Sequence, residues 1–535
     1  MIRLNSIKVP LDYTGEDLLR SASRLLALPP SNISSCVLAR QSVDARRKSE
    51  VHFVVNLDVS LRSASDEKRI AARLAGAQGG ATLPWTPPVF PKAARPRLRP
   101  VVIGLGPAGL FASLVLAEAG LCPLILERGQ DVDTRTRDVE AYWRDGQSAF
   151  NPASNVQFGE GGAGAFSDGK LNTGIKDPYA AYVLQTLARF GAPPEILTDA
   201  KPHVGTDRLV GVVRAMREHL LSSGAEVRFG ARVTELVRRD GRIAAVRTDD
   251  DEIPAEHVIL AVGHSARDTF QSLYDTGFTL VPKPFSIGAR IEHPQRLIDE
   301  AQYGPAAGHP RLGPADYKLS LHLPSGRGVY TFCMCPGGEV VAAASEPDSV
   351  VTNGMSRHAR ACENANSALL VGVGSEDFDS DHPLAGMEFQ RRIEQQAFVM
   401  GGGTGCAPCQ TVGDFLRARA SSSLARVTPS YRPGVVPSDL SKLLPDAVVL
   451  AMREALPQLD RKLRGFARPD ALLTGPETRS SSPLRMPRDE RTLSVDCDGL
   501  HPCGEGAGFA GGITSAAVDG IRCAASILQA LSEAI

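Results

Sequence analysis

Three glycines, Gly104, Gly106 and Gly109, have the spacing of a turn that binds a dinucleotide. They follow the apolar β-branched run 101–103 and lead into an apolar helical pattern. In such a turn the first glycine permits the tight bend, the second lets the backbone approach a pyrophosphate, and the third lets the helix pack against the strand. The helix N-terminus offers unpaired N–H groups and a positive dipole end to phosphates. The spacing therefore predicts a pyrophosphate site.

An acidic residue completes this pattern. The apolar strand 123–126 is followed by Glu127, roughly twenty residues beyond the last glycine. A carboxylate at this place accepts hydrogen bonds from a ribose 2′-hydroxyl and disfavours a 2′-phosphate. The glycine pattern also fits 159–164 and 506–511, but only the first match has strand, helix, second strand and acid in order. We therefore assign nucleotide binding to the first match.

Two cations are candidates for catalysis. Lys170 ends the glycine-rich stretch 158–169, whose backbone could approach a flat ligand closely. The lysine would then lie beside that ligand or a substrate carboxylate, and a surface lysine after a turn is the equal alternative. Arg479 could face the same cleft, and a structural ion pair is its equal alternative. We carry both residues forward as catalytic candidates.

Two pairs of cysteines stand close together among ten in the chain. Cys406 and Cys409 have the spacing of a redox motif. Cys333 and Cys335 lie in a predicted strand, where alternate residues share a face, so both are expected to be buried small side chains. Four thiolates could hold zinc, but about seventy residues separate the two pairs. We expect free thiols and no metal site.

The composition limits the classes of function. A chain of 535 residues is too long for one core and predicts roughly two to four domains. A net charge of −1 provides no global field for nucleic acid or an anionic membrane, and an aromatic content of 5% leaves few stacking platforms. The N-terminus has no apolar signal core, and the apolar stretch 101–126 is interrupted by glycines and Glu118. We expect a cytoplasmic protein without nucleic-acid or membrane partners.

The elements that position these residues follow one another along the chain. Residues 1–76 alternate strand and helix patterns, and the prolines and glycines of 77–100 are typical of a semi-rigid linker. Short strands over 227–248 predict a β-meander. Strands, loops and a few helices are expected over 275–490. A glycine-rich turn and an apolar helix then close the chain over 504–531.

Long phrases of the chain resemble the largely uncharacterised bacterial FAD-dependent dehydrogenases, or NAD(P)/FAD-dependent oxidoreductases, within the glutathione-reductase-like two-domain flavoproteins. The resemblance covers nearly the whole chain, including the N-terminal module. It implies FAD and an oxidoreductase fold, and no particular substrate. The shared phrases are 104–109, 127–128, 158–164, 167–171, 258–263, 283–288, 331–338, 354–359, 364–369, 504–505 and 506–520.

The resemblance also implies which residues hold FAD. Glu127 would bind the adenosine ribose, Val233 would offer backbone groups to the adenine, and Glu505 would meet the ribityl chain. Asp is the usual residue at the position of Glu505 in the wider group. The implied cofactor-binding residues are Gly104, Gly106, Pro107, Ala108, Gly109, Glu127, Arg128, Gly162, Lys170, Val233, Ala261, Gly263, Gly504, Glu505, Gly511, Gly512 and Ile513.

Negative charge develops near N1 of a flavin that accepts hydride, so a positive potential is expected there. The N-terminus of the closing helix, at 512–514, can supply it through its dipole and N–H groups.

The expected fold is α/β: a Rossmann-like FAD-binding domain with an inserted mixed β/α substrate domain and a small N-terminal α+β module. The expected boundaries are 1–76 for the N-terminal module, 77–100 for the linker, 101–274 and 491–535 for the two parts of the FAD-binding domain, and 275–490 for the substrate domain.

The expected function is that of an FAD-dependent oxidoreductase, a dehydrogenase or reductase that passes hydride between flavin N5 and a small organic substrate or NAD(P)H. No second complete βαβ unit is visible for a nicotinamide cofactor, so NADH or NADPH would dock transiently, or an organic substrate or another protein would supply electrons. The alternatives are a non-catalytic flavin-binding redox sensor and a flavin monooxygenase. The near-neutral charge disfavours a flavoenzyme that modifies nucleic acid.

Overall fold

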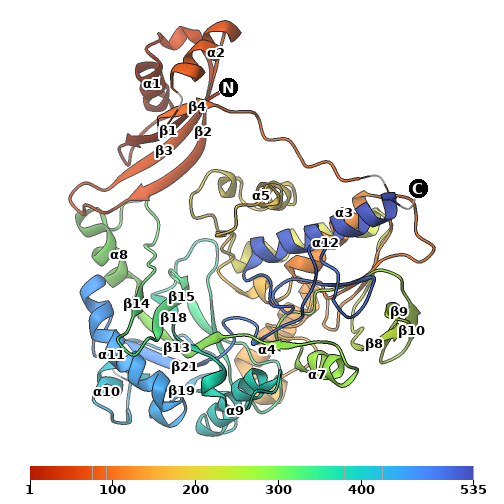
Figure 1. Ribbon diagram of the computed structural model, residues 1–535. Coiled ribbons are helices and arrows are strands. Elements are labelled where there is room, and N and C mark those ends of the chain that lie inside the picture. The colour runs from red at the N-terminus through yellow and green to blue at the C-terminus, as the bar shows by residue number, and fades with distance from the viewer. Residues whose placement is uncertain (75, 77, 92, 379, 425, 534–535) are drawn as a thin grey trace.

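The computed structural model describes residues 1–74, 76, 78–91, 93–378, 380–424 and 426–533 (Figure 1). Position 75 of the expected N-terminal module, positions 77 and 92 of the expected linker, positions 379 and 425 of the expected substrate domain, and positions 534–535 lie outside the described residues.

The N-terminal module is a four-stranded sheet with two helices against it. The strands lie in the order β2-β3-β1-β4. Alternate residues of β3 are buried, which is the pattern of a strand with one face on a core. The elements are β1 (Ile2–Val9), α1 (Gly15–Leu26), β2 (Ile33–Asp44), β3 (His52–Leu61), α2 (Ala64–Arg73) and β4 (Gly79–Ala81).

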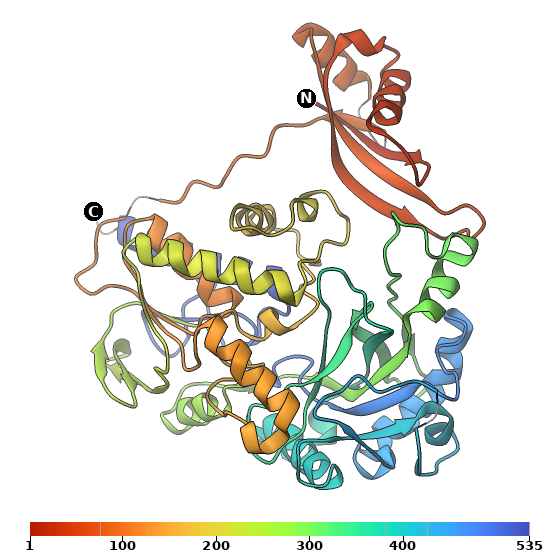
Figure 2. The same ribbon diagram turned by 180° about the vertical axis from the view of Figure 1, so that it is seen from behind.

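Several contacts join this module to the rest of the described chain, and two sets of hydrogen bonds are among them. The backbone of Gln41 exchanges hydrogen bonds of 2.7 and 2.8 Å with Thr198 and Ala200. Arg311 donates to the Tyr13 carbonyl at 2.7 Å, and its guanidinium lies 4.2 Å from the centre of the Tyr13 ring. The described residues of the segment 82–100, which follows β4, lie in no helix or strand, and the segment leads to the nucleotide-binding half of the molecule (Figures 1 and 2).

A parallel sheet of five strands carries the nucleotide-binding turn. Its order is β23-β11-β5-β6-β7, with β5 in the centre. The strands are short and apolar, as expected where helices cover a sheet on both faces. Their bounds are β5 (Val101–Ile103), β6 (Leu124–Leu126), β7 (Glu226–Arg228), β11 (Val258–Leu260) and β23 (Leu500–Pro502).

One strand expected in the β-meander belongs to this sheet instead. Val227 of β7 pairs with Ile125 of β6, so β7 is the edge strand of the parallel sheet. Periodicity cannot distinguish the two arrangements, because pairing with β6 depends on a segment about a hundred residues away. The meander itself consists of β8 (Val233–Arg239), β9 (Arg242–Thr248) and β10 (Glu252–Pro254).

Helices cover the parallel sheet. The closing helix α12 lies beside α3, and the two backbones approach so closely that a Cβ on Gly520 would lie 2.0 Å from the Ala108 carbonyl oxygen (Figure 1). Helix α6 packs against α3 and α4 (Figure 2). The helices are α3 (Pro107–Glu118), α4 (Val132–Asp145), α5 (Tyr179–Arg189), α6 (Thr206–Ser222), α7 (Arg267–Asp275) and α12 (Ile513–Glu533).

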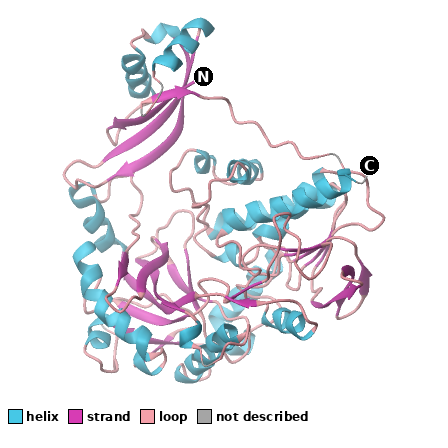
Figure 3. Ribbon diagram, viewed as in Figure 1, coloured by secondary structure: helices cyan, strands magenta, loops and turns pink. Residues whose placement is uncertain are grey.

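A mixed sheet of seven strands forms the other half of the molecule (Figure 3). Its order is β14-β15-β18-β13-β21-β19-β20, and β13 and β18 are buried along almost their whole length. The strands are β13 (Phe285–Pro294), β14 (Ser320–His322), β15 (Gly328–Cys335), β18 (Asn364–Val373), β19 (Ala407–Thr411), β20 (Val435–Pro437) and β21 (Leu472–Glu477). The helices of this half are α8 (Gln295–Tyr303), α9 (Ala385–Met400), α10 (Val412–Leu416) and α11 (Asp446–Lys462).

The chain enters and leaves this half at one place. Strands β12 (Val281–Pro282) and β22 (Leu484–Arg485) pair antiparallel there. A further pair, β16 (Glu339–Ala342) and β17 (Thr352–Met355), lies beside the sheet. The seven-stranded sheet is therefore an insertion in the nucleotide-binding fold. No helix in the described ranges is long and apolar enough to cross a membrane.

Candidate active site

A cavity of about 400 Å³ extends from the nucleotide-binding turn to the seven-stranded sheet. One wall consists of the turn before α3, the end of β11 and the start of α12. The glycine-rich loop 158–170 forms a second wall, and residues of β15, β17 and β21 form a third. Segments that are distant in the chain thus meet at one concave site, as is typical of ligand pockets.

Glycines form the cradle at the nucleotide end. Gly106 faces Gly162, and a Cβ on Gly162 would lie 2.9 Å from the Gly106 Cα. Gly104 has a φ of +94°, and a Cβ there would lie 2.4 Å from the Ala261 carbonyl oxygen. Side chains at Gly104 and Gly162 would collide with the backbone of neighbouring segments, so glycine lets these segments come together around the space for a pyrophosphate. The residues therefore fit a bound dinucleotide.

Glu127 holds three loops around this cradle. Its carboxylate accepts hydrogen bonds from the backbone N–H groups of Leu105 at 2.8 Å, Gly129 at 2.8 Å and Gly159 at 3.0 Å. The side chain is nearly buried and lines the cavity. Arg128 lies 4.4 Å from the centre of the Phe158 ring and also lines the cavity. The ribose role that the sequence implies for Glu127 stays a prediction.

The residues expected to bind the cofactor lie together, with one difference. Gly109 does not line the cavity; a Cβ there would lie 1.9 Å from the Gly104 carbonyl oxygen, so this glycine serves helix packing instead. Those that line the cavity are Gly104, Gly106, Pro107, Ala108, Glu127, Arg128, Gly162, Lys170, Val233, Ala261, Gly263, Gly504, Glu505, Gly511, Gly512 and Ile513.

A charged cluster stands at the other end of the cavity. The Lys170 ammonium lies 3.4 Å from the Asp168 carboxylate, which also pairs with Arg360 and accepts a hydrogen bond from Ser356. Burial would raise the pKa of Asp168, but the two cations and the Ser356 hydroxyl outweigh it and lower the pKa. Burial would lower the pKa of Lys170, but Asp168 and two nearby cysteines outweigh it and raise the pKa. Lys170 therefore stays a cation.

Arg479 borders the cavity but is also held in an ion pair. Its guanidinium lies 2.8 Å from the buried Glu394 carboxylate and donates to Ser265 at 3.0 Å and to Ser345. Burial has the largest effect on Arg479 and lowers its pKa. Glu394 raises the pKa and Arg267 lowers it, so the net change is a lower pKa. Both alternatives considered for this arginine thus hold in part, because it faces the cleft and forms a structural pair.

The expectation that Cys333 and Cys335 are both buried on one strand face is wrong for Cys333. The pairing of β15 with β18 shifts register between Phe332 and Cys335, and Cys333 has a φ of +44°. The bulge breaks the alternation of the strand, since an extra residue re-aims its side chain. Cys333 is partly exposed and lines the cavity, whereas Cys335 is buried.

The second cysteine pair lies elsewhere. Cys409 is buried in β19 and accepts a hydrogen bond from the Thr474 hydroxyl at 3.4 Å. Burial raises the pKa of Cys409 to about 12, which makes it a poor nucleophile. Neither Cys406 nor Cys409 is among the cavity-lining residues.

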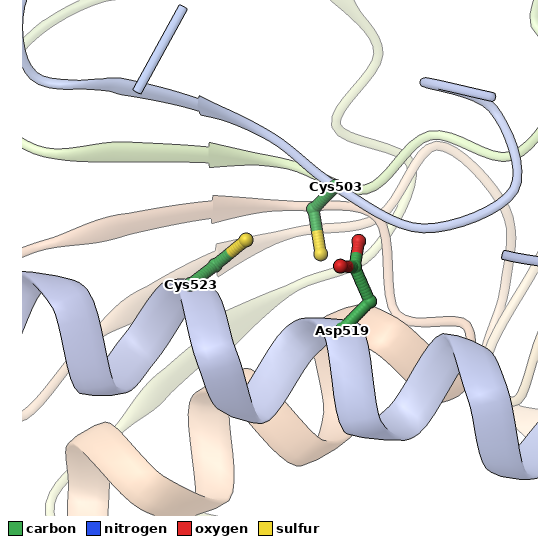
Figure 4. A group of neighbouring side chains, drawn as sticks. All are labelled: Cys503, Asp519 and Cys523. Carbon is green, nitrogen blue, oxygen red and sulfur yellow. The ribbon is translucent and has the colours of Figure 1, made fainter. Parts of the chain in front are cut away.

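Cys503, Asp519 and Cys523 form a buried cluster at the cavity wall, where Cys503 is one of the lining residues (Figure 4). Their ligand atoms lie within 4.8 Å of one another, and the side chains come from the end of β23 and from α12. Arg488 already supplies a cation there, at 2.5 Å from Asp519 and 3.7 Å from the Cys523 sulfur. Asp519 also accepts the Gly504 N–H at 2.7 Å. The cluster therefore positions the loop at Gly504, and the arginine leaves no electrostatic need for a metal.

Sequence reasoning missed several residues of the cavity wall. His264 lies 3.5 Å from Glu505, and its Nε2 is buried with no hydrogen-bond partner among the described residues. Asp168 and Cys333 lie within the shared phrases 167–171 and 331–338, which could have pointed to them. Most of the other cavity-lining residues that were missed belong to no local sequence motif. The cavity-lining residues without an assigned role include Gln157, Asp168, His264, Ser265, Phe332, Cys333, Thr352, Asn353, Glu477 and Cys503.

Comparisons with known proteins show similarity to FAD-dependent proteins. A family described as FAD-dependent protein, C-terminal domain-like, matches residues 284–480, and a domain of unknown function matches residues 1–60. Protein FixC of Escherichia coli K12 is 29% identical over 213 residues, 37% of this chain and 44% of FixC. The FAD-dependent monooxygenase nodY2 of Hypoxylon pulicicidum is 28% identical over 219 residues, 38% of this chain and 47% of that protein.

A further relative matches from end to end. An uncharacterised protein of Clostridium beijerinckii is 46% identical over 530 residues, which are 99% of this chain and 98% of that protein. The glycine cradle fits the dinucleotide part of FAD, and the matching family is FAD-dependent. The chain is therefore an FAD-dependent flavoprotein and belongs to the same family as the Clostridium beijerinckii protein.

Proposed function

We propose that this flavoprotein is a dehydrogenase or reductase of the glutathione-reductase-like two-domain group, which passes hydride between flavin N5 and a small organic substrate or NAD(P)H. FAD, when bound, supplies hydride transfer. The supporting observation is that one cavity has nucleotide-binding residues on one wall and polar residues of the seven-stranded sheet on another. A cofactor against the first wall leaves the second for a substrate.

Lys170 gives the substrate end a fixed cation. Its ammonium pairs with the buried Asp168, which keeps both the charge and the position of the lysine. A cation at this place binds a substrate carboxylate and stabilises negative charge that develops nearby. The first turn of α12 adds unpaired N–H groups, because Gly512 and Ile513 line the same cavity.

His264 is the residue we propose for proton transfer. It lines the cavity, and its Nδ1 lies 3.5 Å from a Glu505 oxygen. The opposite nitrogen, Nε2, has no hydrogen-bond partner among the described residues, so it can take a proton from a substrate hydroxyl or amine. Glu505 then stabilises the protonated ring.

The electrons come from an organic substrate, or from NADH or NADPH that docks transiently. Within the described ranges the nucleotide-binding turn occupies the parallel sheet, and no second sheet of this kind is present for a nicotinamide dinucleotide. We also propose a cytoplasmic location, since the ten cysteines are free in the structure.

A flavin monooxygenase is the second candidate. The similarity to nodY2, whose name states that activity, favours it. Oxygen consumption coupled to a hydroxylated product would support the monooxygenase over the dehydrogenase. Slow reduction by every donor, with a protein partner bound in one redox state only, would instead support the redox sensor.

The first experiment records the visible spectrum of the purified protein and follows bleaching at about 450 nm under anaerobic NADH and NADPH in parallel. Bleaching within seconds by one of them supports a reductase. A yellow protein that neither reduces directs the search to organic donors. The control is Gly106→Ala, whose added methyl group enters the cradle. A wild-type protein that stays colourless after reconstitution with FAD would overturn the proposal.

A further inference from the structure

We propose that Cys333 and Cys335 form a redox-active dithiol at the substrate end of the cavity, in which Cys333 attacks small organic disulfides. The inference rests on the proposed function only in taking this end of the cavity as the substrate site. The first observation is the bulge in β15. It turns Cys333 to the cavity wall and leaves Cys335 buried behind it. The Cys333 thiol is therefore accessible to small molecules in the cavity, and the Cys335 thiol is not.

Two cations, each paired with a carboxylate, lie near the two cysteines. Lys170 lines the same cavity, and Arg290 donates to the Cys333 carbonyl oxygen at 2.8 Å. Arg290 is fully buried and paired with Glu477 at 2.8 Å, so its position is fixed. Fixed cations stabilise a thiolate, which is the nucleophilic form of cysteine.

The two thiols differ in acidity. The Cys335 thiol, which donates to the Cys333 carbonyl oxygen at 3.3 Å, is the largest influence on the Cys333 thiol and lowers its pKa; burial opposes this, and Lys170 and Arg290 add to it. The neighbouring Cys333 side chain and burial raise the pKa of Cys335. An attacking thiolate beside a protonated thiol is the arrangement of a nucleophilic and a resolving cysteine.

The reaction balances without a further reactant. The Cys333 thiolate attacks one sulfur of a disulfide R–S–S–R, forms a mixed disulfide and expels R–S⁻. The Cys335 thiol loses its proton and attacks the Cys333 sulfur, which forms the Cys333–Cys335 disulfide and expels the second R–S⁻. The protein loses two electrons and the disulfide gains them.

The test uses the FAD-loaded protein and 2,2′-dithiodipyridine, which releases one thiopyridone for each exchange. Wild-type protein is expected to release about two equivalents in a fast phase, and Cys335→Ser about one, because the mixed disulfide then has no resolving thiol. Cys333→Ser should lack the fast phase. Mass spectrometry locates the product, since the tryptic peptide 328–357 contains Cys333 and Cys335 and no other cysteine.

Two variants sharpen the result. Lys170→Met removes a cation that lowers the pKa of Cys333. The rate of the fast phase, plotted against pH, should therefore reach half of its maximum at a higher pH than in the wild type. Cys406→Ser removes a partly exposed thiol outside the cavity and should leave the fast phase intact. A fast phase that survives in Cys333→Ser, or a peptide 328–357 that stays unmodified, would overturn the proposal.

The same measurement on Gly106→Ala separates this proposal from the proposed function. Thiol exchange needs the cysteines and not the flavin, so a fast phase should persist in protein that has lost FAD. A fast phase together with no reduction by any organic donor would support the dithiol and contradict the dehydrogenase. Reduction of the flavin by an organic donor, without a fast phase of thiol exchange, would support the dehydrogenase and contradict the dithiol.

Discussion

Arg479 donates two hydrogen bonds to the buried carboxylate of Glu394, at 3.1 and 2.8 Å. Arg267 binds the same carboxylate at 2.9 Å, and the Thr478 hydroxyl donates to it at 2.6 Å. Glu394 comes from α9 of the inserted half, and Arg267 begins α7 of the nucleotide-binding half. The carboxylate therefore joins the two halves behind the cavity and is shared by two buried cations, of which Arg267 also pairs with Glu346.

Replacing Glu394 should be severely destabilising. Glu394→Gln removes the buried carboxylate that Arg479 and Arg267 share, although Arg267 keeps its pair with Glu346. The loss of one partner from a buried ion cluster costs roughly 3–5 kcal/mol. Chemical unfolding measures the loss. Glu388→Gln, at an exposed position on the same helix, should change the free energy of unfolding by less than about 0.5 kcal/mol. Equal effects of the two variants would contradict the bridging role.

The glycines of the first turn should fail in different ways. Gly106→Ala meets nothing closer than 3.7 Å within the protein, so the fold should survive while FAD affinity falls at least about tenfold. Gly109→Ala places a methyl group 1.9 Å from a carbonyl oxygen, so it should lose roughly 1–3 kcal/mol of stability. FAD titration and thermal unfolding of both variants check this. Normal FAD binding by Gly106→Ala would contradict the cradle.

Glu160 should make stability depend on pH. Burial raises the pKa of Glu160 to about 7, against the opposing Val132 N–H and Arg217. The folded protein therefore keeps a proton that the unfolded chain, with a pKa near 4.5, has released. This contribution is present below about pH 4.5 and is lost as pH rises to about 7, by roughly 3 kcal/mol in total.

Glu160→Gln tests this dependence, because an amide resembles the protonated carboxyl group. Denaturant unfolding from pH 4.5 to 8 should show a flatter profile for the variant than for the wild type. Glu454→Gln, at an exposed position on α11, should keep the wild-type profile. A Glu160→Gln profile identical to the wild type would rule out this residue as the source.

Asp519 should matter for FAD binding through the Gly504 loop. Asp519→Asn weakens its pair with Arg488 and its acceptance of the Gly504 N–H, so FAD affinity should fall while the helix persists. FAD titration measures the change, and Glu533→Gln at the exposed end of α12 is the control. Stoichiometric zinc in the purified protein would contradict the role given to Arg488.

The sequence determined the nucleotide site because its constraints are local. Gly104, Gly106 and Glu127 lie within one βαβ unit, where strand, turn and helix set the geometry over a few dozen residues. Close backbone approach leaves glycine as the residue that fits, so the signal survives in the sequence. The dinucleotide cradle follows from it, whereas FAD as the particular dinucleotide was implied by the resemblance to a known family.

Only the tertiary structure decided the rest of the cavity. The bulge at Cys333 depends on pairing with β18, the place of β7 depends on β6, and the partner of Arg479 lies 85 positions earlier in the chain. Such contacts leave no periodicity, because each residue type also suits many other surroundings. The physical reason is that register and ion pairing are settled by which distant segments pack together, and a linear pattern records only what each segment needs by itself.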